Sequence, residues 1–349
     1  MHTVDKPPST APAGPLLVQA APPGAVAAVP AGTLGGRAGS RATAAGSRPG
    51  LLGDLIRLIR PNQWPKNLLV VPLALVDAPG LTLAGLARVG WAVLVFTLAS
   101  SLVYVWNDAM DRHRDRAHPV KRHRPIASGR VGLPLAWAYG VGLAGLLAVA
   151  IVAGPAVPWW PLAAYLVLNV AYSRWLKYVP LVDVFVVAAG FVLRAVQGYV
   201  ATGAAISSWL LITVFALCLL LILGKRRNEL LVSGSEHRPA LRAYSPQYLE
   251  YLIVLCATLA VTAFLFHLAD DGSLVAPYTD LALLVSVPFA TFGLARYLQV
   301  VVVQRDGGDP VRVLLRDRMM VVNASLWAAL LGSIVLVARF PGMAEVFDR

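Results

Sequence analysis

Residues 107–130, NDAMDRHRDRAHPVKRHRPIASGR, follow directly on an apolar run at residues 91–106, WAVLVFTLASSLVYVW. If the helix of the apolar run continues, Asp108, Asp111 and Asp115 project from one face, because at about 100° per residue they fall within roughly 60° of one another. Carboxylates on one face repel each other, and a hard divalent cation removes that repulsion. The spacing therefore predicts a site for Mg²⁺, with Mn²⁺ as an alternative, that also binds substrate phosphates.

Basic side chains are concentrated in the same stretch, and they are Arg112, Arg114, Arg116, Lys121, Arg122, Arg124 and Arg130. Lys and Arg could hold the phosphate charge that the metal leaves unpaired. We therefore take Lys121, Arg122 and Arg124 as candidate substrate-binding residues. Asn107, one turn before Asp111, joins the three aspartates as a candidate catalytic residue. The alternative is a solvated basic loop that only determines how the chain is oriented in a membrane.

The composition indicates a membrane protein. Of the 349 residues, 58% are hydrophobic and only 14% are charged, and the formal net charge is +12. Because this apolar content exceeds that of ordinary soluble domains, we expect the basic excess to reflect orientation in a lipid bilayer and no binding to nucleic acid. Cys218 and Cys256 lie in apolar runs without metal or disulfide spacing, which predicts packing roles for both.

Nine apolar segments are long enough to span a bilayer, some of them only when tilted, which predicts an all-α, polytopic membrane fold. The expected spans cover residues 67–86, 89–106, 133–153, 159–174, 180–201, 207–224, 247–268, 280–303 and 321–340. Residues 1–50 are rich in Ala, Gly and Pro and cannot bury enough apolar surface to offset the entropy of ordering, so we expect a disordered tail. Residues 51–349 would form the transmembrane catalytic domain, as a monomer or a homo-oligomer.

The loops between the expected spans alternate in charge. Loops 105–132, 172–180, 225–246 and 304–320 carry 18 Lys or Arg, whereas the intervening loops carry one, Arg88. The positive-inside rule places the basic loops in the cytoplasm. We therefore expect a multi-pass protein of the plasma membrane whose N-terminus and active site are cytoplasmic.

Further candidate substrate-binding residues lie near the expected cytoplasmic ends of the spans. They are Gln63, Lys66 and Asn67 before the first span, Tyr172 and Lys177 between the fourth and fifth, Arg194 within the fifth, and Lys225 and Arg226 after the sixth. An ionisable group such as Arg194 is costly inside a membrane, so we expect an acid or a bound phosphate as its partner. For the other side chains, anchoring at the membrane interface or setting topology is the alternative.

A motif in this stretch resembles the UbiA prenyltransferase superfamily: Asn107-Asp108-x-x-Asp111-x-x-x-Asp115, followed by Arg122-x-Arg124-Pro125-Ile126-x-Ser128-Gly129. The resemblance covers residues 51–340. It implies a helical bundle around a central cavity, with Mg²⁺ joining the aspartates to a diphosphate. It also implies a lateral opening through which a lipid chain enters.

The loop after the sixth expected span, GKRRNELLVSGSEHRPALRAYSPQ, contains no aspartate where aromatic prenyltransferases of the family carry a second aspartate-rich motif. Together with RPNQWPKN at residues 60–67 and the segment 172–177, this departure resembles the decaprenyl-phosphate phosphoribosyltransferase branch. That resemblance implies a membrane glycosyltransferase that moves 5-phosphoribose from phosphoribosyl diphosphate (PRPP) to decaprenyl or another polyprenyl phosphate, for cell-wall arabinan synthesis. The alternatives are prenyl transfer from a prenyl diphosphate to an aromatic acceptor, and lipid transport.

Overall fold

The computed structural model describes residues 50–71, 82–234, 239–270, 275, 278–303 and 314–339. These residues form helices and no strand, which confirms the all-α fold for this part of the chain. The elements in order are α1 (Leu51–Leu58), η1 (Pro61–Leu69), α3 (Leu83–Met110), α4 (Arg112–Ala117), η2 (Lys121–His123), α5 (Leu133–Ala153), α6 (Trp160–Arg174), η3 (Leu176–Tyr178), α7 (Val182–Thr202), α8 (Ser208–Ser233), η4 (Pro239–Ala243), α9 (Pro246–Ala269), α10 (Thr279–Leu298), η6 (Gln299–Val303) and α12 (Arg318–Arg339). The tail expected at residues 1–50 lies outside the described residues except for Gly50, so its disorder stays a prediction.

Seven helices in the described part of the chain are long and apolar enough to cross a membrane, namely α3, α5, α7, α8, α9, α10 with its π-helical end η6, and α12. The chain is therefore a multi-pass membrane protein. The fourth expected span corresponds to α6, which has only 15 residues and is short for a full crossing. Half of the first expected span, residues 67–86, lies outside the described residues. The count of nine spans stays a prediction for these two reasons.

Local sequence signals mark the ends of several spans. The hydroxyl oxygens of Thr82, Ser207 and Ser245 each accept a hydrogen bond from a backbone N–H three residues further on, at 3.0, 3.3 and 3.1 Å respectively. These are N-caps, which satisfy backbone donors that a helix leaves free in its first turn. At the C-terminus of α7, Gly203 adopts a left-handed conformation (φ +73°), which glycine tolerates at a helix end.

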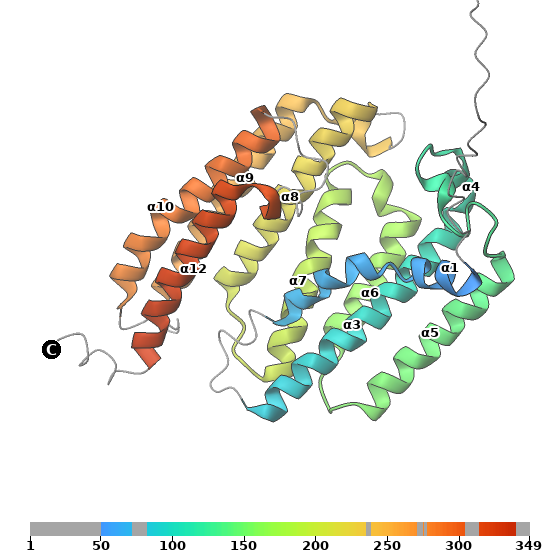
Figure 1. Cartoon of the computed structure of the whole chain (residues 1–349), viewed down its shortest axis with the longest axis horizontal. Coiled ribbons are helices and arrows are strands. Elements are labelled where there is room, and N and C mark those ends of the chain that lie inside the picture. Colours follow the sequence, from blue (N-terminus) through green and yellow to red (C-terminus); the bar gives the residue numbers. More distant parts are fainter. Residues whose placement is uncertain are drawn as a thin grey trace, which may run out of the picture. The chain divides into compact units, whose positions relative to one another are not determined.

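Two of the apolar clusters among the described residues share α7, which lies between α6 and α8 (Figure 1). The first joins α3, α5, α6 and α7 around Phe96 and Tyr165, whose rings lie 5.4 Å apart. The second joins α7, α8, α9 and α10 and includes Tyr297. Cys256 is buried in this second cluster and Cys218 packs against it, both as free thiols, which confirms the expected packing roles.

Helix α8 extends further than the sixth expected span. That span was expected to end at residue 224, but the helix continues to Ser233 and includes the basic residues Lys225, Arg226 and Arg227. The expectation of a loop beginning at residue 225 is therefore wrong. Successive residues on a helix point in directions about 100° apart, so these three cations cannot face one pocket together.

Candidate active site

The acidic motif lies at a break between two helices. Helix α3 ends at Met110, Asp111 adopts a turn conformation (φ −89°, ψ 7°), and α4 begins at the next residue. The helix of the apolar run therefore does not continue unbroken through the motif, contrary to expectation. The N–H of Asp111 still donates to the carbonyl of Asn107 at 2.9 Å, and the N–H of Asp115 donates to that of Asp111 at 2.8 Å. The hydrogen-bond ladder thus crosses the break.

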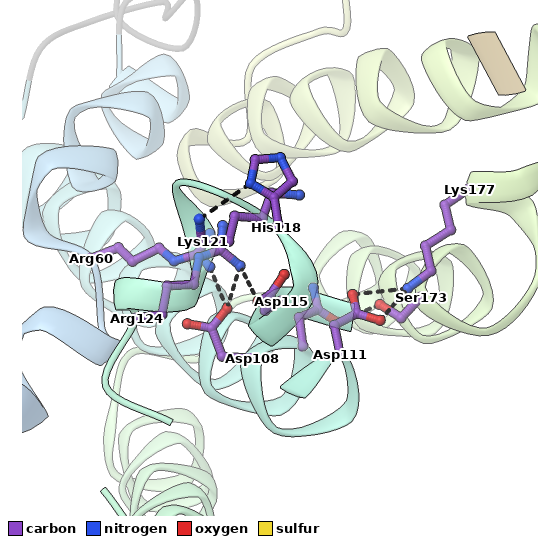
Figure 2. Close-up of polar contacts among 10 residues, drawn as sticks. Arg60, Asp108, Asp111, Asp115, His118, Lys121, Arg124, Ser173 and Lys177 are labelled. Carbon is purple, nitrogen blue, oxygen red and sulfur yellow. Dashed lines mark hydrogen bonds and ion pairs between the residues drawn. The ribbon is translucent and has the colours of Figure 1, made fainter. Parts of the chain in front are cut away.

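A single arginine bridges two of the aspartates. Arg124 Nη1 donates to Asp108 Oδ1 at 3.0 Å and to Asp115 Oδ2 at 2.8 Å, and both carboxylates are only 3% exposed (Figure 2). Arg60 donates to the same Asp108 oxygen, and its guanidinium also lies 4.9 Å from the centre of the Tyr104 ring. Two cations therefore compensate the buried charge of Asp108 and Asp115, as buried carboxylates require.

The third aspartate faces a different cation. Lys177, in η3, donates from Nζ to both carboxylate oxygens of Asp111 at 2.8 and 2.9 Å. Ser173, at the end of α6, lies beside this pair and donates to Asn107 Oδ1 (Figure 2). The motif is thereby tied to the α6–η3 segment, 66 positions away in the chain.

The three aspartates do not converge on one point in the described part of the chain. No group of three or more His, Cys, Asp or Glu side chains within the described residues lies close enough to hold a metal. Each carboxylate instead binds a cation, because unpaired carboxylates would repel one another. The donor set nevertheless suits Mg²⁺ chemically, since carboxylate oxygens are the hard ligands that this ion prefers. The metal site of Asp108, Asp111 and Asp115 stays a prediction.

An apolar pocket of about 300 Å³ adjoins the motif. It lies between α3, α5 and α6, and its lining is apolar except for Asn107 and Asn169. Trp106 and Trp137 form part of the wall, with ring centres 5.0 Å apart. Val141, also in the lining, is 72% exposed, so the pocket opens on the outer surface of α5. The apolar pocket thus reaches from the exposed surface of α5 to Asn107, a residue of the acidic motif.

Arg194 is buried and has neutral partners. It is 5% exposed, and it donates to Asn67 Oδ1 at 2.9 Å, to the carbonyl of Gly190 at 2.7 Å and to the hydroxyl of Tyr165 at 3.0 Å. Asn67 in turn donates to Ser100 Oγ at 3.1 Å. Among the described residues no carboxylate lies within ion-pair distance of Arg194, so of its two expected partners the acid is not found and the bound phosphate stays a prediction.

The basic cluster of α8 is mostly paired with acids. Arg226 donates to Asp183 Oδ2 at 3.2 Å and to Glu229 Oε2 at 2.8 Å, and Arg227 donates to Glu250 Oε1 at 2.6 Å. Both arginines are nearly buried, whereas Lys225 is exposed. We expected these cations to bind a phosphate, but in this structure carboxylates compensate the charge of the two buried guanidinium groups. Arg226 therefore already has two acidic partners, and its binding to a substrate stays a prediction.

A tyrosine completes this second polar network. The Tyr244 hydroxyl accepts from the backbone N–H of Leu181 at 2.6 Å and donates to Asp183 Oδ1 at 3.2 Å. Burial raises the pKa of Tyr244 to about 12, so the hydroxyl keeps the proton that it donates to the carboxylate. Leu181 has a positive φ of 64°, which is unusual for a branched residue and which these contacts stabilise. The network fixes the start of α7, five residues after Lys177.

The model of the UbiA prenyltransferase family matches residues 69–323, which is most of the chain. The chain belongs to the UbiA prenyltransferase family. A protein from Mycolicibacterium smegmatis, named decaprenyl-phosphate phosphoribosyltransferase, is 36% identical over 309 residues, covering 82% of this chain and 93% of that one. A protein of the same name from Corynebacterium glutamicum is 34% identical over 291 residues, or 79% and 85% of the two chains.

The fold is also that of solved UbiA structures. A UbiA homolog from Archaeoglobus fulgidus, bound to GPP and Mg²⁺, has a TM-score of 0.58 at 18% identity, and the match covers 81% of this chain and 100% of that chain. At this identity the likeness establishes the shared helical architecture. Together with the family match, it confirms the resemblance that the motif indicated.

The structure adds to this UbiA motif a residue that the sequence analysis missed. Arg60 immediately precedes η1 and binds Asp108 across 48 positions of the chain. Its place in RPNQWPKN was visible, but no spacing rule linked it to the acidic motif. Gln63 and Lys66 follow in η1, half-buried and exposed respectively, and the N–H of Gln63 donates to the Arg60 carbonyl at 2.8 Å.

The remaining predicted residues lie near the motif with differing exposure. Lys121 is half-buried, and its N–H donates to His118 Nδ1 at 3.3 Å, beside Arg124 (Figure 2). Arg122 is exposed and donates to the His123 ring at 3.3 Å. Tyr172 is half-buried near the end of α6. The structure therefore brings Asn107, the three aspartates, Arg124 and Lys177 together, and it leaves Arg226 and Arg194 in separate networks.

Proposed function

We propose that this UbiA-family protein transfers 5-phosphoribose from PRPP to decaprenyl or another polyprenyl phosphate and releases diphosphate, as a step in cell-wall arabinan synthesis. The observation that carries the proposal is the 36% identity to a protein named decaprenyl-phosphate phosphoribosyltransferase over 93% of that protein's length. Family membership alone suits any diphosphate donor, so this similarity decides between phosphoribosyl and prenyl transfer.

The arrangement of charges supports a reaction between two anions. Arg60, Arg124 and Lys177 converge on the acidic motif and pair with its carboxylates. When a metal ion binds these carboxylates, the three cations become available to bind phosphates. A neighbour in fold is described as bound to GPP and Mg²⁺. We propose that Asp108, Asp111 and Asp115 bind Mg²⁺, which when bound stabilises the charge on the departing diphosphate.

In the proposed reaction, an oxygen of the lipid phosphate attacks C1 of the ribose and the bond from C1 to the diphosphate oxygen breaks. The ionised lipid phosphate is already a nucleophile, so no general base is needed. We expect an oxocarbenium-like transition state and inversion at C1. Arg60 and Arg124 hold the diphosphate beside the motif, and Lys177 binds a further phosphate. These roles place cations where negative charge accumulates.

The deciding experiment supplies two substrate pairs separately to the purified protein in detergent with MgCl₂. One pair is radiolabelled PRPP with polyprenyl phosphate, and the other is prenyl diphosphate with 4-hydroxybenzoate. The proposal predicts a radiolabelled lipid product from the first pair only. If only the second pair reacts, the chain is an aromatic prenyltransferase, and if neither reacts but lipid crosses reconstituted vesicles, it is a transporter.

The apolar pocket supports a long-chain acceptor, and we propose that it receives part of the polyprenyl chain. Gly140 lines the pocket, whereas a side chain at Gly142 on the same helix would meet nothing within 4 Å. Gly140→Leu should therefore occupy pocket volume and raise the KM for polyprenyl phosphate about tenfold, as expected for an excluded apolar contact. Gly142→Leu is the matched control. Equal KM values for the two variants, measured in detergent, would argue against this pocket.

We also propose that the acidic motif and the N-terminus face the cytoplasm. The 18 Lys or Arg of the alternate loops support this orientation. Cysteines introduced singly at exposed Arg122 and at exposed Asp280 provide the test, in a background without Cys218 and Cys256. A membrane-impermeant thiol reagent applied to intact cells should label the cysteine at position 280 and spare that at 122. The reverse pattern would invert the proposed topology.

A further inference from the structure

An ion pair fastens α1 to the loop that follows the acidic motif. Asp54 points inward from α1 and is 3% exposed. Both of its carboxylate oxygens accept from Arg130 Nε, at 3.1 and 2.9 Å. Arg130 also donates from Nη2 to the carbonyl of His123 at 3.0 Å, so its guanidinium is held by α1 on one side and by the loop on the other.

The two elements joined by this ion pair each supply one arginine to Asp108. Arg60 follows α1, and Arg124 belongs to the same loop as Arg130. Both donate to the same oxygen, Asp108 Oδ1. The ion pair of Asp54 with Arg130 therefore joins the two elements that carry these arginines.

The apolar contacts of α1 involve Leu58 and the half-buried Leu55, and the ion pair adds to them. Helices of eight residues are too short to be stable in isolation, so α1 depends on tertiary contacts. Leu58 is its one fully buried apolar side chain, and it lies in a cluster with Ile126 and Val131 of the loop. Leu52 and Ile56 are exposed. Apolar contacts have little directionality, whereas a guanidinium bound to both oxygens of a carboxylate defines orientation.

The backbone conformation of Arg60, directly after α1, makes the position of its side chain sensitive to the orientation of α1. Arg60 has a left-handed conformation (φ 50°, ψ 66°), which a non-glycine residue adopts only when its surroundings hold it there. Its N–H donates to the Arg57 carbonyl at 3.3 Å. A small rotation of α1 would therefore move the long Arg60 side chain away from Asp108.

We propose that Asp54 is a positioning residue. Through Arg130 it keeps α1 seated on the loop and so holds Arg60 and Arg124 together at the diphosphate site. Asp54 itself touches no substrate. This inference rests on the proposed function in one respect, namely that Arg60 and Arg124 bind the diphosphate of the donor.

The test measures binding of inorganic diphosphate in MgCl₂ to the purified full-length protein by calorimetry. Asp54→Asn and Arg130→Gln should each weaken binding about tenfold, since each removes a charge-assisted contact that orients Arg60. Arg57→Gln is the matched control, because the Arg57 side chain is 58% exposed and lies 3.9 Å from the same carboxylate. It removes a positive charge nearby and should leave the affinity unchanged.

A double-mutant cycle with Arg60→Gln separates positioning from a general loss of stability. If Asp54 acts through Arg60, the variant with both Asp54→Asn and Arg60→Gln should bind diphosphate no more weakly than Arg60→Gln alone. Effects that multiply would overturn the proposal, as would wild-type affinity in Asp54→Asn. If Asp54→Asn cannot be purified folded, Arg130→Gln takes its place in the cycle, since the Arg130 side chain is 32% exposed.

Failure of the proposed function and failure of the positioning role give different results. Wild-type protein that binds diphosphate but transfers nothing from PRPP would overturn the phosphoribosyl assignment and leave the positioning role standing. Wild-type protein that binds no diphosphate in MgCl₂ would overturn the positioning role itself.

Discussion

Asp108→Asn should reduce transfer from PRPP by about 100-fold or more, the loss expected when a group that organises transition-state charge is removed. Asp108 is the carboxylate on which Arg60 and Arg124 meet, and it is 3% exposed. Asparagine has the same shape but one acceptor oxygen fewer and no charge. The variant would therefore bind a divalent cation weakly and would leave two arginines less well ordered.

The measurement is initial rate at saturating PRPP and polyprenyl phosphate, with thermal stability recorded to confirm folding. Asp280→Asn, at an exposed carboxylate in the first turn of α10, is the matched control and should keep full activity. EDTA should abolish wild-type activity, and MgCl₂ should restore it. Full activity of Asp108→Asn, or turnover that EDTA leaves intact, would contradict the metal site.

Lys177→Ala should raise the KM for PRPP by a factor of about 10 to 100, the range expected for one hydrogen bond to a charged group. Lys177 Nζ lies 2.8 Å from Asp111 Oδ1 and its side chain is only 13% exposed. Such an ammonium group can exchange the carboxylate for a phosphate when a metal binds Asp111. Lys177→Arg should raise the KM for PRPP by a smaller factor, because the charge is kept and only the geometry changes.

Arg174→Ala is the matched control for this substitution. Arg174 is an exposed cation at the end of α6, three residues before Lys177, so its removal changes the net charge equally without touching the motif. The two variants are compared by KM and kcat for PRPP. An unchanged KM in Lys177→Ala, or the same change in both variants, would rule out a specific phosphate contact.

Much of the span arrangement followed from hydropathy. The expected span at residues 133–153 coincides with α5, Leu133–Ala153, and those at 159–174 and 247–268 agree with α6 and α9 to within one residue at each end. The expected ends of the spans were wrong where a charged segment stays helical. Helix α8 runs nine residues past its expected end, because Arg226 and Arg227 find carboxylates inside the protein and need no aqueous loop.

The sequence pattern singles out the acids of the candidate site more readily than its cations. Asp108, Asp111 and Asp115 stood out because their spacing is a local pattern. Arg60 did not, since it reaches Asp108 from 48 positions away. Arg226 was expected to bind a substrate; it lies between two carboxylates, a pairing that the sequence analysis did not anticipate, and its substrate role stays a prediction.

Hydropathy and residue spacing act over one or two helical turns, so the membrane class, the helical fold and the acidic motif could be inferred from the order of the amino acids. The tertiary structure decided which cation meets which acid, the break at Asp111 and the tie between Asp54 and Arg130. The ion pair between Asp54 and Arg130 joins residues 76 positions apart. Such pairs form only where packed helices bring two side chains within a few ångströms, and no local pattern encodes that distance.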